Sequence, residues 1–127
     1  MPDTIRPGLV MVDHEFLKNL ASTREVEITV SGRKSGRRIS TPVWFVHEGD
    51  KLYLVPVQGS DSNWYKNVVA KPTVEIAAKG RKVTVTAKPI SNPSKVNEAV
   101  EKLRSKYGAG EVEKYYSKLD AAMEVSI

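Results

Sequence analysis

The segment SGRKSGRRIS at residues 31–40 brings basic side chains, serines and two glycines together in ten positions. In a tight turn, backbone N–H groups can converge on one point, while serine, arginine and lysine side chains donate further hydrogen bonds to an anion. Gly32 and Gly36 supply the conformational freedom that such a turn needs. The segment therefore predicts a cradle for a phosphate-like group. A solvated hairpin turn, whose charges protect a sheet edge from aggregation, is the alternative interpretation.

The remaining polar and aromatic residues exclude some chemistries and suggest others. The chain has no cysteine, so disulfides and thiolate metal sites are excluded, and neither His14 nor His47 has the neighbours that a metal site requires. Trp64 and Tyr65 form an aromatic pair at the start of an expected helix, in a polar loop that gives them no obvious packing need. Trp64 could nevertheless plug the end of a barrel.

Length and charge bound the kind of protein. The 127 residues fit a single domain over 1–127, and the formal net charge of +5 suits phosphorylated ligands, nucleic acid or an anionic surface. No apolar run approaches the length of a membrane span, so we expect a cytoplasmic protein.

The hydrophobic pattern predicts the elements that position these residues. Apolar and polar residues alternate cleanly in consecutive segments joined by short turns, which indicates hairpins and therefore an antiparallel sheet. Pro42 is typical of an edge strand or a bulge. So many strands in a small domain favour a sheet curled into a barrel with short helices at its ends. Asp13, Ser62 and Asn92 are the candidate helix caps. The expected helices cover 13–23, 62–69, 93–107 and 111–120, and the six expected strands cover 25–31, 38–48, 51–57, 73–78, 82–90 and 122–127.

Four short motifs follow one another in the order GRKSG at 32–36, TP at 41–42, WYKN at 64–67 and AKP at 70–72. Over about residues 24–90 this order resembles the deazaflavin-dependent nitroreductase family, whose members share a split barrel with pyridoxamine-phosphate-oxidase-like flavoproteins. The resemblance implies an α+β fold, an antiparallel split β-barrel of the FMN-binding type with about six strands and flanking short helices. It also implies an oxidoreductase that binds the deazaflavin coenzyme F-420 or FMN.

The resemblance further implies which residues bind and react. The turn at 33–35 would hold the phosphate of the cofactor's side chain, and the Trp64 segment with Asn67 would help to seat it. Ile39 and Gln58 stand where family members often carry an arginine and a lysine, so both cofactors stay open. The implied catalytic residues are Tyr115 and Tyr116. The implied cofactor-binding residues are Arg33, Lys34, Ser35, Gly36, Arg38, Thr41, Pro42, Val57, Gln58, Trp64 and Asn67.

The expected reaction is hydride transfer to a small planar acceptor such as a quinone, a nitro compound or an enone, with a tyrosine phenol as proton donor. Tyr107 resembles the tyrosines that line the family's substrate pocket, although it could instead pack a helix on the sheet. Residues 44–46 and 55–57 could form a floor for the cofactor ring or belong to the core. Related split barrels pair as homodimers, so we expect one here.

Two other functions remain open from the sequence. One is a non-enzymatic flavin or haem carrier on the same fold. The other is a barrel that binds single-stranded nucleic acid, with Trp44, Phe45 and Tyr53 as a stacking platform and the basic turns as phosphate contacts.

Overall fold

The computed structural model describes residues 14–127, so the expected cap at Asp13 lies outside the described residues. These residues form, in chain order, α1 (His14–Ser22), β1 (Val26–Ser31), β2 (Arg38–Val43), β3 (Phe45–Glu48), β4 (Lys51–Leu54), the short 3₁₀ helix η1 (Gly59–Asp61), α2 (Asn63–Ala70), β5 (Thr73–Ala78), β6 (Arg81–Ile90), α3 (Pro93–Tyr107), α4 (Ala109–Tyr115) and β7 (Ala122–Ser126).

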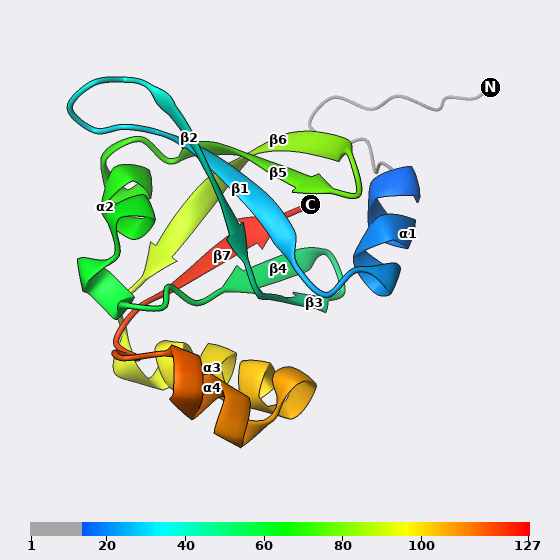
Figure 1. The fold of residues 1–127 in the computed structure, drawn as a ribbon, viewed down its shortest axis with the longest axis vertical. Helices are drawn as coiled ribbons and strands as arrows, with labels where there is room; N and C mark the ends of the chain where they lie inside the picture. Colours follow the sequence, from blue (N-terminus) through cyan, green and yellow to red (C-terminus); the bar gives the residue numbers. More distant parts are fainter. Residues whose placement is uncertain (1–13) are drawn as a thin grey trace.

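The strands form one curled antiparallel sheet, as the alternating pattern predicts. Its seven strands lie in the order β2-β1-β5-β6-β7-β4-β3, and every neighbouring pair is antiparallel. In β1, Val26, Ile28 and Val30 are buried while the residues between them are not. Figure 1 shows the sheet curling, with α2 on one side and α3 and α4 below the strands β3, β4 and β7. The expected barrel-like curl is confirmed.

The prediction of six strands was wrong at one place, because the expected strand over 38–48 divides at Trp44. β2 ends at Val43 and pairs with β1, whereas β3 begins at Phe45 and pairs with β4. The chain therefore crosses at Trp44 from one edge of the sheet to the other. Pro42 lies on β2, which is an edge strand, and this part of the prediction is confirmed. An edge strand tolerates proline because its open side needs no N–H to bond a neighbouring strand.

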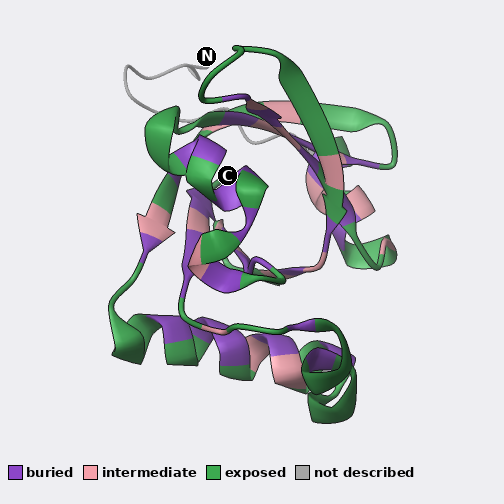
Figure 2. Cartoon of the chain, turned by 60° about the vertical axis from the view of Figure 1, so that its left-hand side comes forward, coloured by how far each residue is buried: buried purple, intermediate pink, exposed green. Residues whose placement is uncertain are grey.

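Two apolar clusters hold the fold together. The first fills the inside of the curled sheet and includes Phe16 of α1 and Val68 of α2, both essentially fully buried. The second lies between the outer side of the sheet and the helices α3 and α4, where Leu103 and Val112 are fully buried. Figure 2 shows the buried residues of α3 on its sheet-facing side and exposed residues along β2. No helix within 14–127 is both long and apolar enough to cross a membrane.

Of the two predicted helix caps within the described residues, Asn92 is confirmed and Ser62 is not. Asn92 caps α3 as predicted, since its Oδ1 accepts hydrogen bonds from the N–H groups of Ser94 and Lys95. Ser62 occupies the cap position of α2, but its hydroxyl accepts the Gln58 N–H at 2.9 Å instead of capping the helix. Ser62 therefore fixes the preceding loop rather than the helix that it precedes.

Candidate functional site

A cavity of about 920 Å³ extends from the β1–β2 loop past α2 to the end of α4. Its wall combines the β1–β2 hairpin, the chain crossing at Trp44, the segment after β4, the first turns of α2 and the last residues of α4. The lining residues are Glu25, Gly32, Arg33, Lys34, Ser35, Ile39, Thr41, Pro42, Val43, Trp44, Val55, Val57, Gln58, Ser62, Asn63, Trp64, Asn67, Tyr115 and Tyr116. A volume of this size can enclose a drug-sized or cofactor-sized molecule.

The loop between β1 and β2 forms the cationic end of the cavity. It closes on itself, since the Gly32 N–H donates to Arg37 O at 2.8 Å and the Gly36 N–H donates to Gly32 O at 2.9 Å. The Ser35 hydroxyl accepts the Arg37 N–H at 3.2 Å, and Gly36 adopts the left-handed φ of 74° that this closure requires. The expected convergence of backbone N–H groups on an anion is therefore wrong for these donors, which are satisfied within the loop. The cationic side chains remain to provide the attraction.

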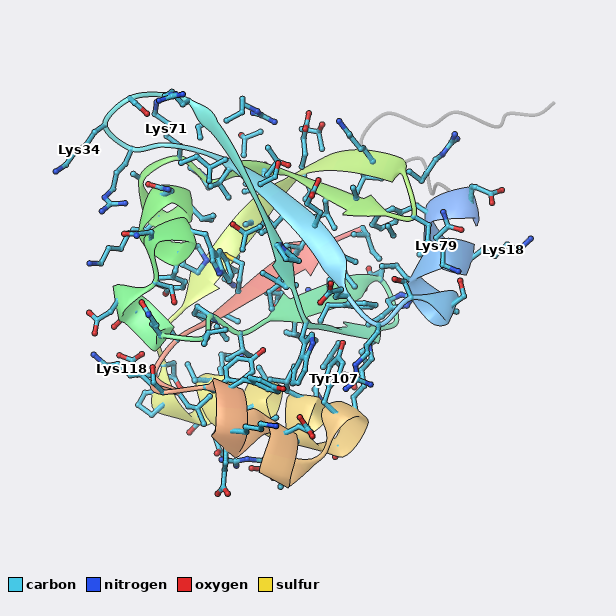
Figure 3. All side chains as sticks on the ribbon, viewed as in Figure 1. Lys18, Lys34, Lys71, Lys79, Tyr107 and Lys118 are labelled. Carbon is cyan, nitrogen blue, oxygen red and sulfur yellow. The ribbon has the colours of Figure 1, made fainter. Side chains whose placement is uncertain are left out.

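Asn67 fixes this loop from α2. Its side chain is only 4% exposed, and its Oδ1 accepts both the backbone N–H of Arg33 at 3.0 Å and the guanidinium Nη1 of Arg33 at 2.8 Å. Figure 3 shows Lys34 at the outer tip of the loop and Lys71 beside the same loop. Because one buried amide holds both the backbone and the side chain of Arg33, the guanidinium is oriented before any ligand arrives.

The other end of the cavity is aromatic. Trp44 lies flat against Tyr107, with ring centroids 4.2 Å apart and an interplanar angle of 7°, and it meets the rings of Tyr115 and Tyr116 at 5.7 Å and 6.0 Å. The Arg24 guanidinium lies 5.5 Å from the centre of the Trp44 ring. These contacts hold the plane of Trp44 in one orientation at the cavity wall.

Tyr107 supports this end from behind rather than lining it. Its hydroxyl donates to Arg24 O at 2.6 Å and accepts the Phe45 N–H at 3.2 Å, which ties the end of α3 to the chain crossing. Tyr107 is not among the described lining residues and belongs to the second apolar cluster, which supports its packing interpretation. Figure 3 shows Tyr107 on the sheet-facing side of α3.

Several polar groups on the cavity wall are buried without a partner in the part of the chain that the structure describes. Trp64 and Tyr116 are each only 8% exposed, yet the Tyr116 hydroxyl and the Trp64 indole N–H have no hydrogen-bond partner there. Burial raises the pKa of the Tyr116 phenol, and the neighbouring Tyr107 adds to the rise, so Tyr116 is protonated at neutral pH. Buried donors of this kind are normally satisfied by water or a ligand.

The cavity gathers most of the residues that the sequence singled out. Gly36 and Arg38 do not line it, and Arg38 instead forms an ion pair with Glu75 at 2.9 Å. The other proposed cofactor-binding residues and both proposed catalytic tyrosines line the wall. Tyr116 lies just beyond α4, because the helix expected over 111–120 ends at Tyr115. Trp64 both lines the cavity and belongs to the inner core, so its two interpretations are compatible.

Sequence reasoning missed several lining residues, namely Glu25, Val43, Ser62 and Asn63. In the sequence, Glu25 and Val43 show only the alternation of a strand and nothing that indicates a ligand site. The wall that they form arises only when β1 and β2 pair. Phe45 is fully buried, which overturns the stacking platform for single-stranded nucleic acid. The arrangement suits a long, largely flat ligand with an anionic group at the loop and an aromatic face at Trp44.

Comparisons with known proteins identify the family to which this cavity-bearing fold is similar. The family model described as F420H(2)-dependent quinone reductase matches residues 15–127. The F420H(2)-dependent quinone reductase Rv1261c of Mycobacterium tuberculosis (strain ATCC 25618 / H37Rv) is 33% identical over 63 residues, which cover 47% of this chain and 42% of that protein. The match thus spans less than half the length of this curated relative.

Solved structures extend the likeness to most of the chain. A structure titled F420-H2 Dependent Reductase (FDR-A) is 25% identical, with a TM-score of 0.63 over 81% of this chain and 94% of its own. A structure titled domain-swapped dimer has a TM-score of 0.64 at 25% identity, over 81% of this chain and 80% of its own. The heme storage protein HutZ of Vibrio cholerae, at 10% identity and a TM-score of 0.67 over 92% of this chain and 90% of its own, shares the fold alone. These neighbours confirm the predicted split barrel.

Proposed function

The chain belongs to the F420H(2)-dependent quinone reductase family, and we propose on this premise that it reduces a quinone with the deazaflavin coenzyme F-420. The observation that supports the proposal most directly is the two-ended cavity. Cationic side chains gather at the β1–β2 loop, and at the far end Trp44 and the buried Tyr116 line the same space.

The residues present fit such a coenzyme. Arg33 and Lys34 would hold its phosphate, with Asn67 keeping the Arg33 guanidinium in position. The buried Trp64 N–H, which lacks a partner within 14–127, would donate to a polar edge of the bound molecule. When bound, the deazaflavin supplies the hydride, and the protein supplies binding and orientation.

In the reaction, the protein itself would donate a proton and contact the acceptor. A quinone that gains one hydride and one proton becomes a hydroquinone, and we assign the proton to the Tyr116 hydroxyl. That hydroxyl is protonated at neutral pH, so it can donate to the acceptor oxygen. Tyr115, half exposed at the cavity rim, would contact the acceptor as it enters.

The deazaflavin is proposed ahead of FMN because the matching family and the curated relatives are named for it. A haem carrier is disfavoured on different grounds. His47 lies outside the cavity and its ring hydrogen-bonds Gly49 O at 2.8 Å. The described lining therefore offers no histidine to the iron, and Tyr115 and Tyr116 are its only side chains of a type that binds haem iron.

Fluorescence titration tests the cofactor assignment. We expect the protein to bind the deazaflavin coenzyme more tightly than FMN, and the double variant Arg33→Ala/Lys34→Ala to lose about tenfold or more in affinity while keeping its fold. The double variant Lys82→Ala/Lys88→Ala is the control, because it removes the same charge from exposed positions on β6 outside the cavity. Unchanged affinity in the loop variant would rule out the phosphate site.

Turnover tests the reaction. Oxidation of the reduced coenzyme should require added quinone, and Tyr116→Phe should lower kcat by about tenfold or more with a smaller change in KM. A Tyr116→Phe variant with the wild-type kcat would remove this residue from the mechanism.

We further propose that the protein is a homodimer. The supporting observation is the solved relative whose structure is titled a domain-swapped dimer. Analytical ultracentrifugation over a range of protein concentrations tests this directly, and a monomer at all concentrations would exclude it.

A further inference from the structure

Glu25 is a cavity residue with no role in the proposed reaction so far. It is the one acidic residue among the described lining residues, and its side chain is exposed. In the part of the chain that the structure describes, no ion pair engages its carboxylate. Its charge is therefore presented to whatever occupies that part of the cavity.

The β1–β2 hairpin separates Glu25 from the cationic loop. Val26 lies opposite Val43 and Ser31 opposite Arg38, so Glu25 is at the open end of the hairpin beside Trp44, whereas the loop follows Ser31. At about 3.3 Å per residue, the six residues of β1 put roughly 20 Å between the two ends. The cavity thus has cations at one end and a carboxylate at the aromatic end.

The cations near the aromatic end, Arg24, Lys106 and Lys114, are not among the described lining residues. The Arg24 guanidinium is held over the rings of Trp44 and Tyr107, at 5.5 Å and 5.2 Å from their centres, and Arg24 does not line the cavity. Lys106 Nζ donates to Phe45 O at 2.8 Å, and Lys114 Nζ lies 5.3 Å from the centre of the Tyr115 ring. Glu25 is therefore the one charged residue at this end among the described lining residues. Cavity walls of low dielectric strengthen its repulsion of an anion relative to that in open water.

We propose that Glu25 determines acceptor specificity by repelling anionic acceptors from the aromatic end of the cavity, which admits neutral or cationic planar ones. This inference rests on the proposed function, since it takes the loop as the coenzyme end and the Trp44 end as the acceptor end. The two ends then have opposite selectivity: the loop attracts the anionic tail of the coenzyme, and Glu25 keeps other anions from the acceptor position.

The test compares 1,4-naphthoquinone with its 2-sulfonate on protein saturated with coenzyme. Glu25→Gln keeps the side-chain shape and removes the charge, so kcat/KM for the sulfonate should rise about three- to tenfold while the value for the neutral quinone changes less than twofold. The rise should shrink at high ionic strength. Glu27→Gln is the matched control, because Glu27 is exposed on β1 two residues after Glu25, lies outside the cavity and loses the same charge.

Equilibrium binding of the same two quinones, followed by quenching of tryptophan fluorescence in protein carrying the oxidised coenzyme, gives a readout that needs no turnover. If the ratio of the two dissociation constants is the same in wild type, Glu25→Gln and Glu27→Gln, the inference is wrong, whether or not the quinone is reduced. If the ratio shifts only in Glu25→Gln but no quinone is reduced, the inference stands and the proposed function fails.

Discussion

Replacing Asn67 with alanine should weaken coenzyme binding without touching the coenzyme's phosphate. Asn67 is 4% exposed and accepts two hydrogen bonds from Arg33, one from the backbone and one from the guanidinium. The backbone bond is worth about 1 kcal/mol, and the charge-assisted bond about 1.5–3 kcal/mol in a buried setting. Because Arg33 is exposed and regains water, the second figure must be discounted, and we expect a net loss of about 1–2 kcal/mol in unfolding free energy.

The same change should lower coenzyme affinity by about tenfold, because a guanidinium released from Asn67 must be ordered again when the phosphate binds. Urea denaturation measures the stability, and fluorescence titration measures the affinity. Asn67→Asp separates the two effects. It keeps an acceptor for Arg33 and so should keep the stability, but it adds a negative charge beside the anion and so should still bind weakly.

A double-mutant cycle decides whether Asn67 acts through Arg33. In an Arg33→Ala background, Asn67→Ala should cause little further loss of affinity, which corresponds to a coupling of about 1 kcal/mol. Strictly additive losses would refute the reasoning, because they would mean that Asn67 contributes to binding independently of the Arg33 guanidinium.

Two further outcomes follow from other contacts. Tyr107→Phe should keep the stack on Trp44 but lose the hydroxyl's hydrogen bonds, lowering the unfolding free energy by about 1–3 kcal/mol in urea titrations, and a loss below about 0.5 kcal/mol would contradict it. Hydrogen bonds from Ser60 hold the pKa of the Asp120 carboxyl below its ordinary value of 3.8, so its contribution to stability is present above that value and is lost as pH falls through the lower, folded-state pKa. Asp120→Asn should therefore be less stable than wild type at neutral pH, with the gap closing in strong acid, and a gap independent of pH would argue against this account.

Much of the fold could be predicted because its signals are local. Alternation gave the strands, Pro42 indicated an edge strand, and Asn92 followed by proline predicted the start of α3. The division at Trp44 was not predictable, since the apolar pattern continues through it. It depends on the Tyr107 hydroxyl and ring, which come from a residue 62 positions away from the Phe45 N–H that it binds.

In the candidate site too, features with a local sequence signal could be predicted and features that depend on long-range contacts could not. The loop at 32–36 was visible because its composition is unusual, and motif order brought in Trp64 and Asn67. What Asn67 does was not visible, because its partner Arg33 lies 34 residues earlier in the chain. Glu25 carries no signal beyond its position at the start of the expected strand over 25–31, since its place on a cavity wall exists only after the sheet has curled.

The cavity lies where the two apolar clusters meet, with Val43 and Trp64 from the inner one and Val55 and Tyr116 from the one beneath α3 and α4. Each cluster packs largely within itself, so substitutions that reshape the tyrosine-bearing helices leave the packing behind the Arg33 loop intact. Under the proposed function, the acceptor end of the binding surface can therefore change in sequence while the coenzyme end is kept.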